Sequence, residues 1–249
     1  MDNNIGAFLQ CYKNPLATYH SLFSFKKYYP QGTIVLLSDN GYDYTEMAKH
    51  FKCIYIHETE NIPLVWYPLK DTDLYNKTIA LMNRIIKAFE LFDEKYIMWL
   101  EDDVSVNNKV NEEELKYDLN GYCPNSFLQK HLIELQKTYN FLDINKTYVF
   151  SGHGGSIFTK NKILNYLKNT KIIDDLLNNW KEYKFYECAQ DLFISLLITL
   201  QGGEIGAYTG HLDDVSNSIN PNIIVQHQYK RWYGKEMPDD LKHLVKDYK

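Results

Sequence analysis

The stretch YIMWLEDD, residues 96–103, decides how this chain is interpreted. Five apolar or aromatic residues run without interruption and give way directly to Glu101, Asp102 and Asp103. A short apolar run that ends in polar residues is typical of a strand buried on both faces of a parallel sheet. The sequence therefore predicts a central strand with three carboxylates at its carboxyl end, where ligands of open parallel sheets bind.

The residues before this stretch alternate between two hydrophobic patterns. Continuous apolar runs predict strands at 4–11, 33–38 and 53–57, and helical spacing predicts helices at 15–29, 44–51 and 75–93. Alternation of this kind is the signature of parallel βαβ units. We therefore expect an α/β fold with a mostly parallel central sheet flanked by helices.

The rest of the chain predicts one domain, residues 1–249, built from two halves. Residues 1–106 form the first half, 107–146 form a polar insertion or linker with helical potential near 126–140, and 147–249 form the second half. The second half predicts strands at 147–150, around 156–158 and at 223–225, and helices near 161–169 and 188–201. We expect its strands to add a small second sheet.

Composition excludes several classes of protein. The 249 residues are 45% hydrophobic and 24% charged, as in an ordinary globular domain. A net charge of −5 without a basic stripe argues against a nucleic-acid-binding surface. Four widely spaced cysteines without a CxxC pair argue against a zinc ribbon or a disulfide framework. The N-terminus lacks a signal-peptide pattern and no apolar run is long enough to span a membrane, so we expect a soluble, cytoplasmic protein.

The three adjacent carboxylates predict a cation site. Side chains alternate along a strand, so Glu101 and Asp103 should point to the same side. Neighbouring carboxylates repel one another unless a positive charge is bound between them. Their oxygens suit Mg²⁺ or Mn²⁺, which take remaining ligands from phosphates, so a diphosphate ligand follows as a hypothesis. The alternative is a solvated acidic turn without a ligand.

With this acidic cluster at the end of a central strand, the sequence resembles glycosyltransferases of the GT-A fold with their DxD motif. It is most similar to the inverting family two group. The resemblance covers about residues 4–235 and rests on several segments that occur in the family's order. It implies a Rossmann-like enzyme that moves a sugar from a nucleotide-sugar to a hydroxyl of a glycan or glycoconjugate, with Mn²⁺ or Mg²⁺ as cofactor. UDP-sugars are favoured as donors and GDP-sugars are the alternative.

The resemblance also implies residues that bind the donor. Asp39, in LLSDN, would contact the nucleobase or ribose, although aspartates in such turns often bond only locally. Arg84 would pair with the diphosphate or with an acidic residue of the 101–103 cluster, and Lys77 is a weaker candidate. Glu101 and Asp102 would also face the nucleotide. The alternative for Arg84 is a position on the solvent-facing side of its helix, without a ligand.

For the metal, the resemblance implies Asp103 and Glu101, helped by a histidine late in the chain. His227, in VQHQYKRWYG, has the corresponding place, and its rivals are His153 and His211. Lys230 and Arg231 would contact phosphate, and Trp232 and Tyr233 would stack on a sugar.

The acceptor side rests on two further segments. SGHGGSIF resembles the glycine-led strand pair beside the acceptor, which implies Gly154 and Gly155, although a simple hairpin would look the same. ECAQDLF resembles the segment that carries the general base, which implies Asp191. Gln190 stands where the family has Glu, so Glu187 is an alternative base. An acidic residue at a helix N-terminus is also favoured by the helix dipole alone.

The expected reaction is a single displacement with inversion at the anomeric carbon. Asp191 would remove the acceptor proton while the metal neutralises charge on the departing nucleoside diphosphate. Two alternatives remain: a retaining glycosyltransferase of the same fold, and a non-catalytic module that binds a nucleotide or glycan.

Overall fold

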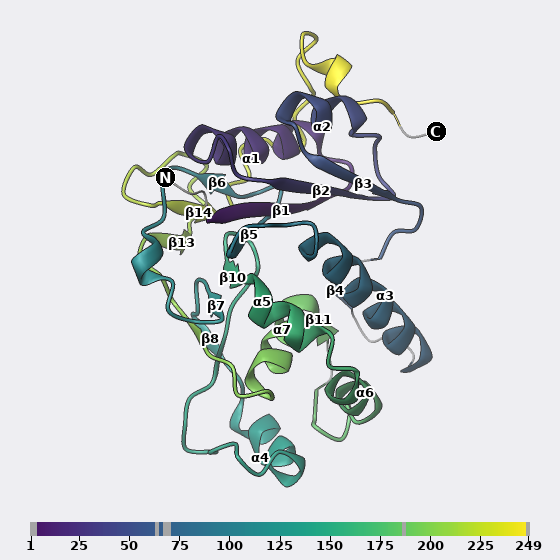
Figure 1. The fold of residues 1–249 in the computed structure, drawn as a ribbon, viewed down its shortest axis with the longest axis vertical. Helices are drawn as coiled ribbons and strands as arrows, with labels where there is room; N and C mark the ends of the chain where they lie inside the picture. Colours follow the sequence, from purple (N-terminus) through teal and green to yellow (C-terminus); the bar gives the residue numbers. More distant parts are fainter. Residues whose placement is uncertain (1–3, 63–64, 67–70, 186–187, 248–249) are drawn as a thin grey trace.

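The computed structural model describes residues 4–62, 65–66, 71–185 and 188–247. Within them, a seven-stranded sheet has the strand order β12-β7-β10-β5-β1-β2-β3 (Figure 1). Four neighbouring strands are parallel: β5 (Tyr96–Leu100), β1 (Ile5–Cys11), β2 (Ile34–Asp39) and β3 (Ile54–Glu58). The expected mostly parallel central sheet is confirmed for this part of the chain.

The antiparallel strand lies inside the sheet, next to β5. β10 (Ile157–Thr159) is antiparallel to both β5 and β7 (Leu119–Asn120), and β12 (Ile205–Gly206) is parallel to β7. β7 lies inside the segment 107–146, which was expected to be an insertion or linker. That segment therefore contributes a strand to the central sheet.

Alternation of side chains along the strands divides the core into two layers. Ala7 and Leu9 of β1 pack with α1 (Pro15–Tyr28) and α2 (Thr45–Phe51) on one face of the sheet. Phe8 of β1 packs on the other face with α3 (Asp71–Phe89), α5 (Lys160–Leu167) and α7 (Gln190–Thr199). Both faces are thus covered by helices (Figure 1), which explains why the central strands β5 and β1 are buried along their whole length and are mostly apolar.

The remaining elements extend the second half. α4 (Gln129–Thr138) lies within the predicted helical region, whereas α6 (Thr170–Asn178) was not predicted from the sequence. Short 3-10 turns occur at η1 (Glu112–Glu114) and η2 (Lys242–Leu244). Two-stranded sheets pair β4 (Val65–Trp66) with β11 (Cys188–Ala189) and β8 (Asn125–Ser126) with β9 (Val149–Phe150).

A three-stranded sheet determines the geometry of the site. It contains β13 (His211–Asp213), β14 (Val225–His227) and β6 (Ser105–Val106), in the order β13-β14-β6. β6 follows the acidic cluster within two residues, so this sheet joins the C-terminal part of the chain to the end of β5. Among the described helices, none combines the length and apolar character that a membrane crossing requires.

Candidate active site

The acidic cluster lies at the carboxyl end of β5, where the chain turns toward β6. Val104 N donates to Glu101 O at 3.1 Å, which closes this turn. β6 then pairs with β14 in antiparallel register, Val106 opposite Val225, and Tyr229 N donates to Asp103 O at 2.8 Å. Strand pairing therefore brings His227, at the end of β14, beside two carboxylates that are more than a hundred residues earlier in the sequence.

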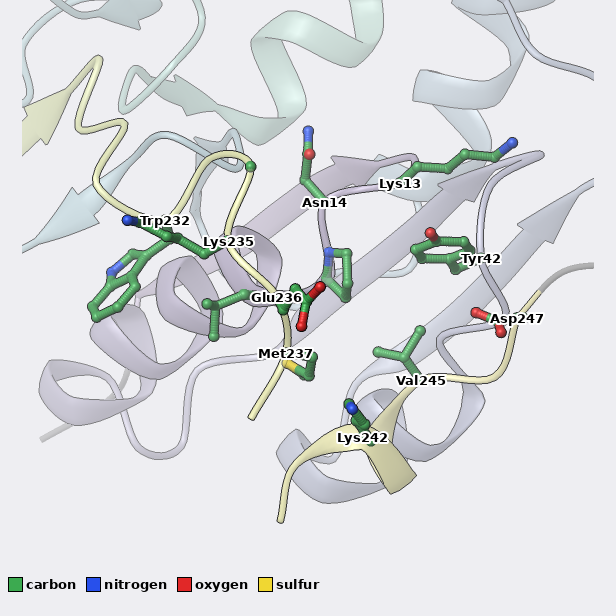
Figure 2. Close-up of a pocket in the computed structure, with 13 residues that line it drawn as sticks. Lys13, Asn14, Tyr42, Trp232, Lys235, Glu236, Met237, Lys242, Val245 and Asp247 are labelled. Atoms are coloured by element: carbon green, nitrogen blue, oxygen red, sulfur yellow. The ribbon is translucent and has the colours of Figure 1, made fainter. Parts of the chain in front are cut away.

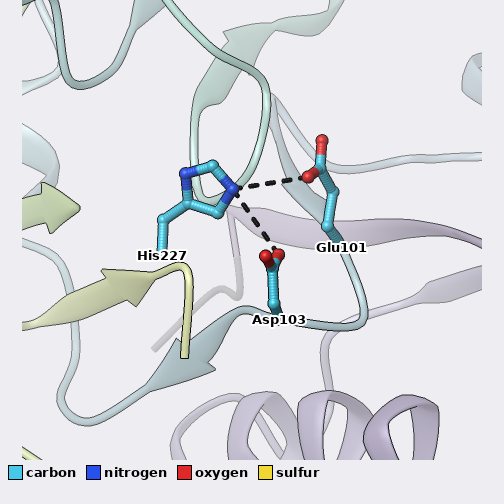
Figure 3. Close-up of side chains that lie close together, drawn as sticks. All are labelled: Glu101, Asp103 and His227. Atoms are coloured by element: carbon cyan, nitrogen blue, oxygen red, sulfur yellow. Dashed lines mark ion pairs between the residues drawn. The ribbon is translucent and has the colours of Figure 1, made fainter. Parts of the chain in front are cut away.

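Glu101, Asp103 and His227 form a compact group of possible metal ligands. One ligand atom from each lies within 4.8 Å of the others. Nε2 of His227 is 3.4 Å from Oε2 of Glu101 and 3.5 Å from Oδ1 of Asp103. Figure 3 shows this nitrogen directed at both carboxylates. Of the three candidate histidines, His227 is the one that joins the carboxylates in this group.

The electrostatics of this group favour a bound cation. Burial, together with the charge of Glu101, raises the pKa of Asp103 to about 6. Burial alone would lower the pKa of His227, but the carboxylates of Asp213 and Glu101 raise it to about 10. Oδ1 of Asp103 is buried and accepts no hydrogen bond from any described residue. A proton on His227 thus supplies positive charge that the carboxylates require, and a divalent ion bound by the same three groups would replace it.

Asp102 points away from this group toward the start of α1. It accepts a hydrogen bond from Nδ2 of Asn14 at 2.8 Å and another from the hydroxyl of Tyr233. Burial raises the pKa of Asp102, and these two hydrogen bonds oppose that shift. Lys230 instead lies beside the other carboxylates, with Nζ 3.8 Å from Oδ2 of Asp103. The predicted phosphate contact of Lys230 stays a prediction, and its position beside the cluster is consistent with it.

Asp39 and Arg84 form a buried ion pair. The guanidinium of Arg84 donates to Oδ1 of Asp39, and its Nε lies 3.7 Å from Oε2 of Glu58. Asp39 also accepts from Ile62 N at 3.2 Å. One expectation for Arg84 was a partner in the 101–103 cluster; that expectation is wrong, because its carboxylate partners among the described residues are Asp39 and Glu58. Binding of the nucleotide by either residue stays a prediction.

The glycine-rich loop between β9 and β10 packs directly against His227 of the candidate metal-ligand group. A Cβ on Gly154 would lie 2.4 Å from Nε2 of His227, and one on Gly155 would lie 2.7 Å from Nε2 of His211. Gly155 also has a positive φ of 81°. His211 Nε2 lies 2.9 Å from the carbonyl oxygen of Gly154. These glycines let the backbone approach the histidines closely; their predicted role at the acceptor is untested.

The N-terminus of α7, which begins with Gln190 and Asp191, lies beside the glycine-rich loop that contains His153. Gln190 is buried, and its Nε2 lies 2.9 Å from Nδ1 of His153. Burial lowers the pKa of His153, and the charges of Asp191 and Glu101 oppose that shift. Asp191 follows Gln190 directly, and its Oδ1 accepts a hydrogen bond from Leu192 N at 2.8 Å. Its role as general base stays a prediction. The alternative base, Glu187, lies outside the described residues.

A cavity of about 660 Å³ opens beyond the carboxyl ends of β1 and β2 (Figure 2). Its walls include Lys13 and Asn14 after β1, Tyr42 after β2, and Trp232 and Lys235 in the C-terminal segment. Because Asn14 also bonds to Asp102, the cavity adjoins the acidic cluster. Lys77 is half-buried on α3 and does not line this cavity.

Comparison with known proteins gives a likeness of fold. No protein-family profile and no curated protein sequence matches the chain. A structure of the galactosyltransferase LgtC with donor and acceptor sugar analogs is 14% identical, with a TM-score of 0.49, over 96% of this chain and 99% of that one. An active-site mutant of LgtC, with glutamate in place of a glutamine, is 12% identical, with a TM-score of 0.51 and the same coverage. At 12% identity the second likeness shows the fold alone, and that fold is GT-A. It does not single out the inverting family two group.

Several residues of the site were not predicted from the sequence. Asp213 bonds to His227, and Asn14 and Tyr233 bond to Asp102. Tyr233 was expected only beside Trp232, as a ring that stacks on a sugar. No local pattern marks Asp213 or Asn14, since their roles depend on strand pairing and on the loop after β1.

Proposed function

We propose that this chain is a metal-dependent glycosyltransferase that uses a nucleoside diphosphate sugar as donor. The observation that carries the proposal is the convergence of Glu101, Asp103 and His227 at the carboxyl end of a central parallel strand. Ligands of open α/β sheets bind at such ends. The likeness of fold to the LgtC active-site mutant, which spans 96% of this chain, supports the same proposal.

The proposed ion is Mn²⁺. Carboxylate oxygens suit Mg²⁺ and Mn²⁺, while an imidazole nitrogen is a better ligand for transition metals, so this mixed set favours Mn²⁺. Glu101, Asp103 and His227 would hold it, and the ion would supply positive charge to the departing diphosphate. Lys230, beside Asp103, would add a second cation on the same side.

The cavity offers the place for the nucleoside. It lies beside β1, near the point where the order of the parallel strands reverses, between β1 and β5. Tyr42 and Trp232 provide aromatic faces for a base, and Lys13 and Lys235 provide positive charge. The proposed donors are UDP-sugars first and GDP-sugars second.

Asp191 is the proposed general base. It would accept the proton of the acceptor hydroxyl as that oxygen forms its bond to the anomeric carbon and the bond to the diphosphate breaks. This displacement inverts the anomeric centre. Retention is the second candidate, because Gln190 stands where the inverting pattern has glutamate, and its side chain is buried against His153. A glutamine is also the residue replaced in the LgtC active-site mutant.

A thermal-shift series tests the binding half of the proposal. UDP and GDP at about 100 times their Kd should stabilise the folded chain by about 2.7 kcal/mol, and only when Mn²⁺ is present. The control is Asp103→Ala, which should show no Mn²⁺-dependent shift. A shift that is equal with and without Mn²⁺ would refute the metal assignment.

A turnover assay tests the chemistry. The wild-type chain should release nucleoside diphosphate from a donor sugar in the presence of an acceptor, while Asp191→Asn should bind nucleotide normally and release at least a hundredfold less. Binding without release by the wild-type chain would favour the non-catalytic module. ¹H NMR of the product's anomeric proton then separates inversion from retention.

A further inference from the structure

The imidazole of His227 is held from the side opposite the carboxylates Glu101 and Asp103. Its Nδ1 lies 2.7 Å from Oδ1 of Asp213, while its Nε2 faces the carboxylates at 3.4 and 3.5 Å. The two ring nitrogens therefore have different partners, and Asp213 contacts the one that does not face the candidate metal position.

This contact is built into the three-stranded sheet. β13 and β14 are parallel, and their register places Asp213 directly opposite His227. The backbone continues the pairing, since Asp214 N donates to His227 O at 3.0 Å. Because paired residues of neighbouring strands project to the same face, the register itself brings this carboxylate to this imidazole.

A second side chain fixes the carboxylate of Asp213. Nε2 of Gln228 donates to Oδ2 of Asp213 at 3.3 Å, so both oxygens have partners. Gln228 follows His227 directly and has a positive φ of 61°, which is uncommon for a residue other than glycine. The chain therefore turns sharply after His227, and the side chain of Gln228 reaches the carboxylate opposite that histidine.

We infer that Asp213 is a positioning residue for the metal site, acting through His227. A carboxylate that accepts the Nδ1 proton leaves the Nε2 lone pair free for a metal and fixes the ring's orientation. The inference rests on the metal site of the proposed function, and it adds a residue that touches neither the ion nor the substrate.

Mn²⁺ binding to the chain alone, without nucleotide or sugar, tests this inference. Isothermal titration or the EPR signal of free Mn²⁺ gives the affinity of the wild type and of Asp213→Asn. We expect a loss of roughly 10- to 100-fold in Asp213→Asn, the usual effect of removing such a partner. The matched control is Asp214→Asn, which removes the same charge one residue along the chain. The carboxylate of Asp214 accepts a hydrogen bond from Ser216 N, and its further partners are the side chains of Ser216 and Asn220. The affinity of this control should equal that of the wild type.

A second variant keeps the test decisive if Asp213→Asn does not fold. Gln228→Asn tolerates the positive φ, retains the charge of Asp213 and is too short to make the bond, so it should weaken Mn²⁺ binding by a smaller factor. Circular dichroism confirms that each variant is folded at the titration temperature. Affinities within twofold of wild type in both variants would overturn the inference alone. No Mn²⁺ binding by the wild type would overturn it together with the metal site.

Discussion

Gly154 allows a sharp test of the site's geometry. The variant Gly154→Ala places a methyl group 2.4 Å from Nε2 and Cδ2 of His227. Carbon atoms in ordinary contact lie about 3.5–4.0 Å apart, so the imidazole must move by about 1 Å or more. Metal–ligand distances tolerate only about 0.2 Å, and the hydrogen bond from Nδ1 to Asp213 resists the movement.

We therefore expect Gly154→Ala to fold and to bind Mn²⁺ at least tenfold more weakly, a loss of about 1.4 kcal/mol or more. Folding should survive because the atoms displaced belong to the end of a side chain and Gly154 has no positive φ. Isothermal titration with Mn²⁺ measures the affinity, and urea unfolding in EDTA measures the stability of the metal-free chain.

The same loop supplies a matched control. A Cβ on Gly152 meets nothing within 4 Å, so Gly152→Ala makes the same chemical change without the clash. Its Mn²⁺ affinity should equal that of the wild type, and its stability should be equal or slightly higher, because alanine restricts the unfolded chain. If both variants bind Mn²⁺ equally well, the orientation of His227 does not determine metal binding and the reasoning fails.

Three further outcomes follow from the charges. Burial and the charge of Glu101 raise the pKa of Asp103 from 3.8 to about 6, so the metal-free chain should lose stability as pH rises through that range. Asp103→Asn removes this charge and should be roughly 1–3 kcal/mol more stable than the wild type at pH 7, measured by urea unfolding in EDTA. The pKa of His227 is raised from 6.5 to about 10, so protonated His227 stabilises the metal-free fold fully below pH 6.5, and this contribution should disappear as pH rises through 10. A flat stability profile between pH 6.5 and 10 would contradict the ion pairs of His227 with the carboxylates. Arg84→Ala leaves the carboxylate of Asp39 buried without its partner, so it should cost about 3–5 kcal/mol in urea unfolding, and a cost below 1 kcal/mol would show that the pair is not structural.

The sequence by itself determined the parallel half of the fold and the place of its acidic cluster. Apolar runs and helical spacing are local properties, so β1, β2, β3 and β5 and the helices between them were predicted close to their observed bounds. The position of Glu101 and Asp103 at the end of a strand follows from the same pattern. β7 was missed because it is a two-residue strand in a polar segment. α6 was overlooked, although Ile173, Leu176 and Leu177 have helical spacing and are buried.

Only the tertiary structure decided which distant groups join the acidic cluster in the candidate site. His227 was one of three candidate histidines, and the pairing of β14 with β6 selects it. Asp213 has no local signature, because its role arises from the register between β13 and β14. Arg84 could equally have faced the acidic cluster, but it pairs with Asp39 inside the protein. The physical reason is the same in each case: hydrophobic periodicity is encoded along a few neighbouring residues, whereas a metal ligand set and an ion pair depend on which strands and helices meet in space.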